Sequence, residues 1–389
     1  MRTCLVLDAE MQCSIPLMES LWKQGFHITA GSYKRINMGF FSRYPARRVL
    51  YPSPETSPRA FAERILDLAK EHAYSLILPV DDFSSGILSV DRDRFAPYTR
   101  IPIVPFDTFM KARDKGQTMR IAMQEGIPCP PTFFPDSQKI EEIAKEARFP
   151  VLVKANVSSG ARGISLVEKK DDLEATYQRV RAVYGECHIQ EFIPKGGSQY
   201  VADFFLDMQQ ELKAAVVYSK LRFYPVNGGS SVLNRTVHEP EILRQGYKLL
   251  RAMNWYGFAD LDFIIDPRDG MPKVMEVNPR LPTTLRISLA AGMDFPRMLV
   301  NLAMGENIPT STGYRLDVYL RHFPMDVLWF LKSPERFRTS PRFFNFFGPN
   351  MHDQIMCLSD PGPMVGFFLE NLISLLDRDS RKARYSRGW

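Results

Sequence analysis

Two carboxylates and one amide stand close together along a short stretch of the chain, and their chemistry suits a hard metal ion. Glu276 and Asn278 are two residues apart on an expected strand, so their side chains share a face. If the expected hairpin pairs Asp266 with Pro272 around its turn, Asp262 lies directly opposite Glu276. Oxygen donors without His or Cys suit Mg²⁺ or Mn²⁺, and such sites usually rely on substrate phosphates for the remaining ligands.

A solvated surface hairpin is the alternative interpretation of these acids. The apolar neighbours Phe263, Val274 and Val277 indicate that the hairpin is at least partly buried, and buried carboxylates need partners. A slip of one residue in the register would remove the convergence.

Lys154 ends an apolar strand, VLVKA, and a loop rich in Ser and Gly, Ser158–Gly163, follows it. A lysine in this position either extends to solvent or serves as a point charge for phosphate. The loop is either an ordinary hairpin turn or a lid whose backbone N–H groups cradle phosphates. The chain contains no GxxxxGK[ST] segment, so a P-loop is excluded.

Further cations stand beside other expected strands. Lys115 and the pair Lys220 and Arg222 would each be ordinary solvated charges if seen singly. Arg280 follows Asn278 by two residues, and a planar guanidinium beside a metal site suits a carboxylate or a transferring phosphoryl group.

The elements that must position these residues begin with an alternation of strands and helices. Expected strands at 3–7, 75–80 and 101–104, with a helix at 57–69, predict a parallel, doubly wound sheet. The first turn, DAEMQCSIP, has no glycine and so is not a dinucleotide fingerprint. Asp81 and Asp82 follow one expected strand, where they either attract an amine or cap a helix.

The rest of the chain is richer in strands. Helices are expected from residue 107 to 125 and from 136 to 148, and a strand hairpin surrounds the Ser/Gly loop. Later strands are expected at 188–193, 200–206, 212–221, 259–266 and 272–278.

Composition limits the class of protein. Hydrophobic residues make up 45% and charged residues 24%, which is typical of a globular protein with several domains in 389 residues. The net charge of +6 is mild. Five scattered cysteines without a CxxC pair, and no secretory signal or membrane-spanning run, predict a cytoplasmic protein.

The order of these segments resembles the ATP-grasp superfamily, in particular its carboxylate–amine ligase branch with a carbamoyl-phosphate-synthase/biotin-carboxylase-like ATP-binding domain. The resemblance covers about residues 1 to 310 and rests on ARDK, FPVLVKAN, SSGARG, IQEFIPKGG, GFADLDFIID and MEVNPR. It implies an α/β, Rossmann-like pre-ATP-grasp domain at 1–105. An α+β ATP-grasp domain would follow, with a small subdomain and glycine lid at 106–194, a large subdomain and metal site at 195–312, and a C-terminal extension at 313–389.

The resemblance also implies roles for single residues. Asp262, Glu276 and Asn278 would hold magnesium, and Arg280, with Lys220 and Arg222, would act in catalysis. The implied ATP-binding residues are Lys115, Lys154, Ser158, Ser159, Gly160, Gly163, Gln190, Glu191, Phe192, Ile193 and Gln199. Gln199 stands where the family often has an acidic ribose ligand, and Asp262 stands where glutamate is common.

The implied function is an ATP- and magnesium-dependent ligase that joins a carboxylate to an amine through an acyl phosphate. Its substrates would be amino-acid-like compounds or other small metabolites. The rivals are a carboxylase, an acid–thiol ligase or a phosphoryl transferase on the same scaffold, and a nucleotide-binding module without catalysis. No nucleic acid partner is expected, and a homodimer is compatible with the sequence.

The segment from residue 314 onward is rich in Phe and Arg and lies largely outside the resemblance. It is interpreted as a packed accessory subdomain, a peripheral membrane contact or a face for an anionic polymer. Packing is favoured, because Leu328, Phe330, Phe367, Leu369 and Leu372 would otherwise be exposed.

Overall fold

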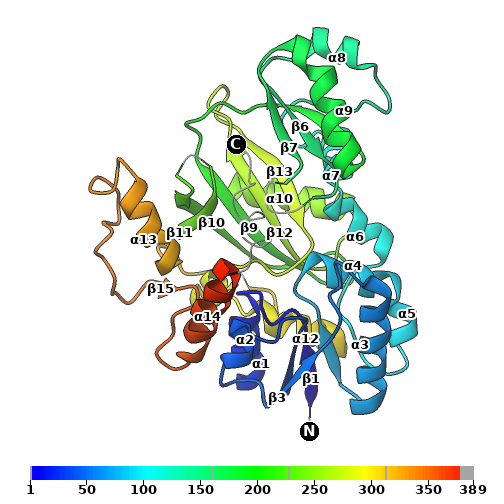
Figure 1. Cartoon of the computed structure of the whole chain (residues 1–389), viewed down its shortest axis with the longest axis vertical. Coiled ribbons are helices and arrows are strands. Elements are labelled where there is room, and N and C mark those ends of the chain that lie inside the picture. The colour runs from blue at the N-terminus through cyan, green and yellow to red at the C-terminus, as the bar shows by residue number, and fades with distance from the viewer. Residues whose placement is uncertain (1, 159–161, 227, 312, 377–389) are drawn as a thin grey trace.

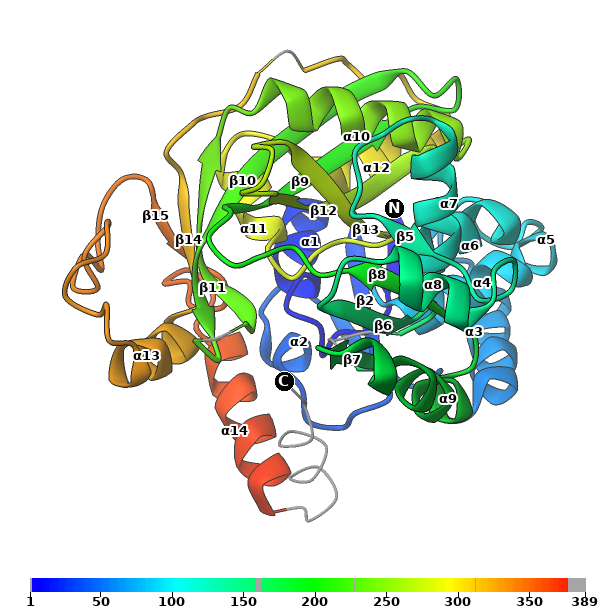
Figure 2. The same ribbon diagram turned by 90° about the horizontal axis from the view of Figure 1, so that it is seen from above.

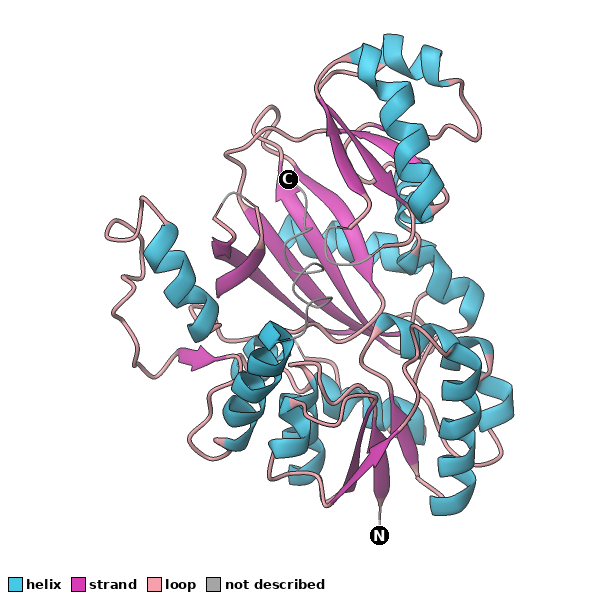
Figure 3. Cartoon of the chain, in the orientation of Figure 1, coloured by secondary structure: helices cyan, strands magenta, loops and turns pink. Residues whose placement is uncertain are grey.

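Three β-sheets organise the chain (Figure 1). The computed structural model describes residues 2–158, 162–226, 228–311 and 313–376. The N-terminal sheet lies at one end, a small antiparallel sheet at the other, and a large sheet between them (Figure 3).

The N-terminal sheet has the strand order β3-β2-β1-β4, and all its pairs are parallel as expected. Its elements are β1 (Thr3–Val6), α1 (Ser14–Lys23), β2 (His27–Ser32), α2 (Met38–Phe41), β3 (Arg47–Leu50), α3 (Pro58–His72), β4 (Leu76–Leu78), α4 (Asp82–Val90) and α5 (Arg92–Phe95). The expected strand at 101–104 is wrong, since only a bridge from Leu76 to Arg100 forms there. Pro102 has no N–H to donate to a neighbouring strand.

The small sheet has the order β5-β8-β6-β7 and is antiparallel. Its region contains α6 (Phe106–Arg113), α7 (Lys115–Gln124), β5 (Thr132–Phe133), α8 (Ile140–Glu146), β6 (Val151–Ala155), β7 (Ile164–Val167), the 3₁₀ turn η1 (Lys170–Asp172), α9 (Leu173–Tyr184) and β8 (Cys187–Glu191). Val151 and Val153 pack into the core with α8 and α9. Because side chains alternate along a strand, Lys154 points to the opposite face.

The large sheet has seven strands in the order β13-β12-β9-β10-β11-β14-β15. Its elements are β9 (Gln199–Leu206), β10 (Leu212–Tyr224), β11 (Ser230–Val237), α10 (Pro240–Ala252), β12 (Gly257–Ile265), β13 (Pro272–Asn278), α11 (Leu285–Ala290), α12 (Phe295–Met304), β14 (Tyr319–Arg321) and β15 (Met351–Asp353). Leu249 of α10 packs on Phe204 and Leu261 from one face of this sheet. The other face carries the charged side chains of the site.

The C-terminal extension completes the large sheet through β14 and β15 and adds α13 (Phe323–Lys332) and α14 (Gly362–Leu376). Trp329, Phe343 and Phe367 are buried, so packing of this extension is confirmed for its inner side. The packing prediction is wrong for Leu328, Leu369 and Leu372, which are 36%, 37% and 55% exposed, and the outer face of α14 is not covered by the described residues. No helix in the described ranges is long and apolar enough to span a bilayer.

Candidate functional site

The hairpin of β12 and β13 brings the expected metal ligands together. Asp262 lies directly opposite Glu276, as predicted, and Asn278 lies opposite Asp260. The predicted pairing at the turn is wrong by one residue, because Ile265, and not Asp266, pairs with Pro272. A β-bulge beside Asp262 shifts the register by one residue and restores the pairing at the site.

Two lysines neutralise the opposed carboxylates. The Nζ of Lys220 donates to Oδ1 of Asp262 at 2.5 Å, and the Nζ of Lys115 lies 3.2 Å from Oε2 of Glu276. Although burial acts to raise it, Lys115 and Lys154 lower the pKa of Glu276 to about 2. Glu276 therefore stays ionised at neutral pH.

Lys154 reaches the same space from the small sheet. It is buried, and its Nζ donates to Oε1 of Gln190 on β8 at 3.1 Å. Burial lowers the pKa of Lys154 to about 8, and Glu276 opposes that shift. The Nε2 of Gln190 donates to Oγ1 of Thr132, so this glutamine fixes the lysine rather than facing a ligand by its side chain.

The Ser/Gly loop begins at the same place. The carbonyl of Ser158 accepts from Nζ of Lys115 at 3.1 Å and from Nη1 of Arg113 at 2.7 Å. Gly163 has a φ of +68°, a conformation that favours glycine. Ser159 and Gly160 lie outside the described residues.

The expected hinge residues connect the small and large sheets. Oε1 of Glu191 accepts from the N–H of Arg148, and its Oε2 lies 3.4 Å from Arg268 beyond β12. Phe192 lines a cavity of about 300 Å³ with neighbours that include Arg148 and Arg268, and Ile193 is buried. Gln199 begins β9 and pairs with Ile264 on β12 and with Lys220 on β10. The position of the acidic ribose ligand common in the family is therefore held by a glutamine next to these two strands.

Two further carboxylates belong to this face, and sequence reasoning missed them. Asp203 of β9 pairs with Asp260 in the register, and both are buried. Oδ1 of Asp260 accepts from Nδ2 of Asn278 at 2.8 Å, and Oδ2 of Asp203 accepts from Oγ of Ser288 at 2.6 Å. Burial and Asp262 raise the pKa of Asp260 to about 7.

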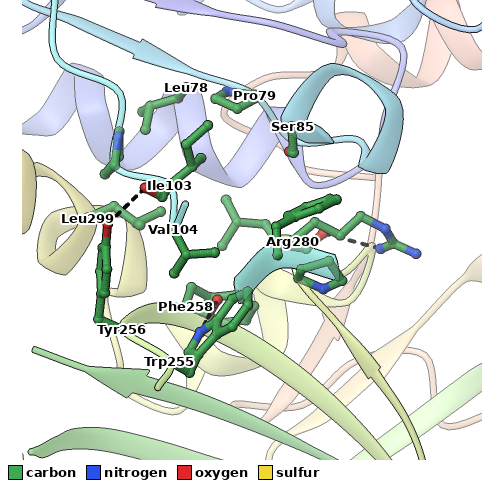
Figure 4. Close-up of a pocket in the computed structure, with 14 residues that line it drawn as sticks. Leu78, Pro79, Ser85, Ile103, Val104, Trp255, Tyr256, Phe258, Arg280 and Leu299 are labelled. Carbon is green, nitrogen blue, oxygen red and sulfur yellow. Dashed lines mark hydrogen bonds between the residues drawn. The ribbon is translucent and has the colours of Figure 1, made fainter. Parts of the chain in front are cut away.

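Arg280 lies between the hairpin and the N-terminal sheet. Its Nε is 3.2 Å from Oδ1 of Asp82, and Arg113 contacts Oδ2 of the same carboxylate at 3.7 Å. Arg280 also borders a cavity of about 40 Å³ whose other walls include Trp255 and Phe258 (Figure 4). Asp81 caps α4 by accepting from the N–H of Phe83, so the helix-cap interpretation holds for it.

The structure corrects the expectation that Arg222 lies at the site beside Lys220. Lys220 is opposite Asn234 on β11, whereas Arg222 is opposite Leu233, the next residue. The bulge at Leu221 therefore turns Arg222 to the other face of the sheet. There its Nη1 donates to Oδ2 of Asp326 at 2.9 Å, and the side chain is fully buried.

The donor set fits a magnesium ion. Within the described ranges no group of three or more His, Cys, Asp or Glu side chains forms a metal cluster, and the set here is two carboxylates and an amide. Because Nδ2 of Asn278 is held by Asp260, its Oδ1 remains as an oxygen donor. Hard oxygen donors that leave room for phosphate oxygens are the usual protein ligands of Mg²⁺.

Residues 112–284 match the family model described as the ATP-grasp domain. The D-alanine–D-alanine ligase of Pelotomaculum thermopropionicum is 26% identical over 50% of this chain and 68% of its own length. The carbamoyl phosphate synthase large chain of Thermotoga petrophila is 26% identical over 52% of this chain but only 19% of its own length. Biotin carboxylase of Campylobacter jejuni, solved as an ATP-analogue complex, superposes with a TM-score of 0.67 at 15% identity, covering 82% of this chain and 74% of that one. The last comparison establishes the fold.

Proposed function

We propose that this chain, whose residues 112–284 form an ATP-grasp domain, is an ATP- and magnesium-dependent ligase that joins a carboxylate to an amine. The observation that carries the proposal is the pairing of Asp262 with Glu276 beneath Lys115, Lys154 and Lys220. Two half-buried carboxylates with the buried Lys115 and Lys154 and the half-buried Lys220 match the charges of a nucleoside triphosphate with its metal. The similarity to a D-alanine–D-alanine ligase supports the same class of reaction.

The proposed roles follow from these contacts. Asp262, Glu276 and Asn278 hold magnesium, which supplies charge neutralisation at the phosphate oxygens when it is bound. Lys115 and Lys154 bind phosphate oxygens by direct contact. The loop that begins at Ser158 and ends at Gly163 covers the phosphates and excludes water.

The nucleotide base is proposed to bind at the segment Gln190–Ile193, which joins the small and large sheets. Backbone groups of Glu191 and Ile193 contact the adenine, and Phe192 lines its surroundings. Gln199 is proposed to lie near the ribose. These positions rest on the motif IQEFIPKGG and on the location of β8 beside β6.

The chemistry consists of two displacements. A substrate carboxylate attacks the γ-phosphate of ATP, which yields an acyl phosphate and ADP, and an amine then displaces inorganic phosphate. Arg280 is proposed to bind the acyl phosphate. It follows Asn278 by two residues, and its guanidinium lies on the side of the N-terminal sheet. Lys220 donates to Asp262 in the described structure. We propose that it also binds the acyl phosphate when a metal ion occupies Asp262 instead.

The proposed layout assigns 1–105 to a Rossmann-like pre-ATP-grasp domain, 106–194 and 195–312 to the two ATP-grasp subdomains, and 313–389 to an extension. The three sheets support the boundaries after residues 105 and 194, whereas β14 and β15 of the extension belong to the same sheet as β9 to β13. Both substrates, an amino-acid-like acid and an amine, are proposed to bind between the N-terminal sheet and the large sheet, on the side of Arg280.

The test measures ADP release with Mg-ATP and hydroxylamine against pooled carboxylic and amino acids, and scores hydroxamate. Hydroxylamine intercepts an acyl phosphate whatever the natural amine is, so dividing the pool identifies the acid. We expect hydroxamate from wild type and none from Glu276→Gln. Asp269→Asn, an exposed change at the tip of the same hairpin, is the matched control.

Two results would overturn the proposal. ADP formation without hydroxamate across all pools would exclude carboxylate activation. Full activity in Glu276→Gln would exclude the proposed metal site.

A further inference from the structure

The outer face of α14 carries an apolar stripe that the described residues leave exposed. Val365, Phe368, Leu369, Leu372 and Ile373 follow the spacing of one helical face, and each is between 37% and 58% exposed. α14 projects from the edge of the molecule in Figure 2 and lies beside α2 in Figure 1. Apolar residues scattered singly need no explanation, but a continuous stripe along a whole helix does.

The orientation of this stripe is fixed by the inner face of the helix. A side chain at Gly362 would lie 1.9 Å from the carbonyl oxygen of Phe41, and one at Gly366 would lie 2.8 Å from Cα of Met38. The ring of Phe367 packs edge-on against His322. Because both glycines permit close contact with α2, the helix cannot rotate to bury its outer face.

Charge is absent from the stripe. Glu370 is the one charged side chain between Gly362 and Leu376, and its Oε1 is 2.5 Å from Nζ of Lys34, on the inner side. The outer face is therefore apolar and uncharged. Any charge at this surface must come from segments other than α14.

The segment that follows the helix in sequence is basic and aromatic. Between residues 377 and 389 two aspartates accompany Arg378, Arg381, Lys382, Arg384 and Arg387, with the aromatic side chains Tyr385 and Trp389. Basic residues beside an apolar helix face are the pattern of proteins that bind anionic lipid surfaces.

The loop between α13 and β15 repeats the same combination. Phe337, Phe344 and Phe347 are 61% to 97% exposed. The basic side chains exposed in the same part of the extension are Lys332, Arg336, Arg338 and Arg342. Exposed aromatic rings interleaved with arginines again suit the interfacial region of a bilayer.

We propose that the C-terminal extension binds the surface of a membrane containing anionic lipids, with the outer face of α14 inserted at the boundary between headgroups and acyl chains. The helix has 15 residues, fewer than the roughly 20 needed to span a bilayer, so it lies in the plane of the surface. A second copy of the chain fits less well, because pairing two such stripes about a two-fold axis would bring their like-charged flanks together.

The proposal is independent of the ligase chemistry and is tested on the full chain. Co-sedimentation is measured with vesicles of phosphatidylcholine alone and with vesicles that also contain phosphatidylglycerol, at low and high salt. We expect binding to the anionic vesicles, weakened by salt, and little binding to the neutral ones.

Two sets of variants separate the contributions. Phe368→Ser with Leu372→Gln removes the centre of the stripe and should weaken binding at least about tenfold. Arg381→Gln with Lys382→Gln and Arg384→Gln should weaken binding by a similar factor at low salt. Val183→Ser on α9, where the valine is 70% exposed, is the matched control and should bind as wild type does. ATP binding by every variant verifies its fold.

Three results would overturn the proposal. The first is no binding to anionic vesicles at low salt. The second is wild-type binding by the Phe368→Ser, Leu372→Gln variant. The third is a concentration-dependent dimer, measured by sedimentation velocity, that this variant converts to a monomer while vesicles bind neither form.

Discussion

Lys220 and Arg222 stand two positions apart on β10, yet they enter two charge clusters of different character. Lys220 joins the partly exposed cluster of Asp262 and Glu276, where charges of both signs lie close together. Arg222 joins Arg321 at Asp326, where two guanidinium groups share one fully buried carboxylate. A single bulged residue, Leu221, separates the two clusters by turning the strand.

The two clusters differ in how their charges are balanced. In the extension, Nη2 of Arg222 also donates to Oγ1 of Thr339, and the guanidinium lies 4.4 Å from the ring centre of Trp329. Both clusters hold buried polar atoms without a hydrogen-bond partner in the described structure, namely Nε of Arg222 and Nη1 of Arg321 in the extension, and Oδ1 of Asp203 and Oδ2 of Asp260 at the site. The clusters differ in burial: Asp326 is fully buried, whereas Asp262 and Glu276 are 22% and 29% exposed, and the proposed function places a ligand at the second cluster only.

The sharpest way to break this comparison is to remove Glu276. Outer-shell partners of a metal typically contribute about 10- to 100-fold to activity or metal affinity. If Glu276 is the direct ligand proposed above, Glu276→Ala should reduce turnover by more than about 100-fold. Unfolding by urea should change little, because Lys115 keeps the carbonyl of Ser158 as an acceptor. Steady-state ADP release and urea titration measure the two effects.

The opposite result is expected in the extension. Asp326→Ala leaves Arg222 and Arg321 buried without their shared carboxylate, and should lower the free energy of unfolding by about 3–5 kcal/mol. The KM for ATP of the folded protein should stay as in wild type. Asp317→Ala, which breaks an exposed pair with Arg235, is the control and should cost no more than about 1 kcal/mol.

A loss of ATP affinity in Asp326→Ala, measured where the variant is fully folded, would contradict the separation of the two clusters. So would an unfolding free energy no lower than that of the Asp317→Ala control. Asp326→Asn, which keeps the shape and one acceptor oxygen, provides a milder variant if Asp326→Ala does not fold.

Much of the site could be predicted from the sequence because it depends on residue type and strand periodicity. Glu276 and Asn278 share a face through their spacing alone, and the apolar strand VLVKA marks Lys154. The facing of Asp262 to Glu276 was also predicted, although a bulge produces it rather than the expected turn. Their roles as ligands stay predictions until the experiments above are done.

The remainder could not be predicted, because it depends on pairings between distant segments. Asp203 is a single acid in an apolar run, VADFFL, and only its pairing with β12 brings it to Asp260. The repeat of acids in GFADLDFI was the available signal for Asp260, since it shares a face with Asp262. The bulge that turns Arg222 away has no local signature, and neither has the contact of Arg280 with Asp82.

The charge of Lys154 offers a smaller test, through pH. Its pKa of about 8, against an ordinary value of about 10.5, means that half of the ligand-free Lys154 side chains have lost their proton near pH 8 and most have lost it at higher pH. If phosphates bind the charged form, ATP binding must take up a proton above pH 8, and the Kd should rise by up to about tenfold per pH unit. Titration calorimetry in buffers of different ionisation enthalpy measures both quantities.

Lys154→Met should bind ATP weakly and without this pH dependence. Lys220 cannot account for the effect, since Asp262 raises the pKa of Lys220 although burial acts to lower it. A Kd for ATP that stays constant from pH 7 to pH 10 in wild type would show that the charge of Lys154 does not bind the phosphates.

The last test concerns Asp260, whose Oδ2 has no hydrogen-bond partner in the described structure. Burial and Asp262 raise the pKa of Asp260 to about 7, whereas an unfolded aspartate titrates near 3.9. The native state therefore holds more protons between about pH 4 and pH 7, and its stability falls as pH rises through that window. Asp260→Asn keeps an acceptor for Nδ2 of Asn278 and removes the titrating group, so its stability should fall less steeply across the window. Urea unfolding of wild type, Asp260→Asn and the exposed control Asp317→Asn at several pH values gives the comparison. Equal slopes in all three proteins would mean that Asp260 ionises as readily as a surface acid, and the proposed difference between the two clusters would lose this support.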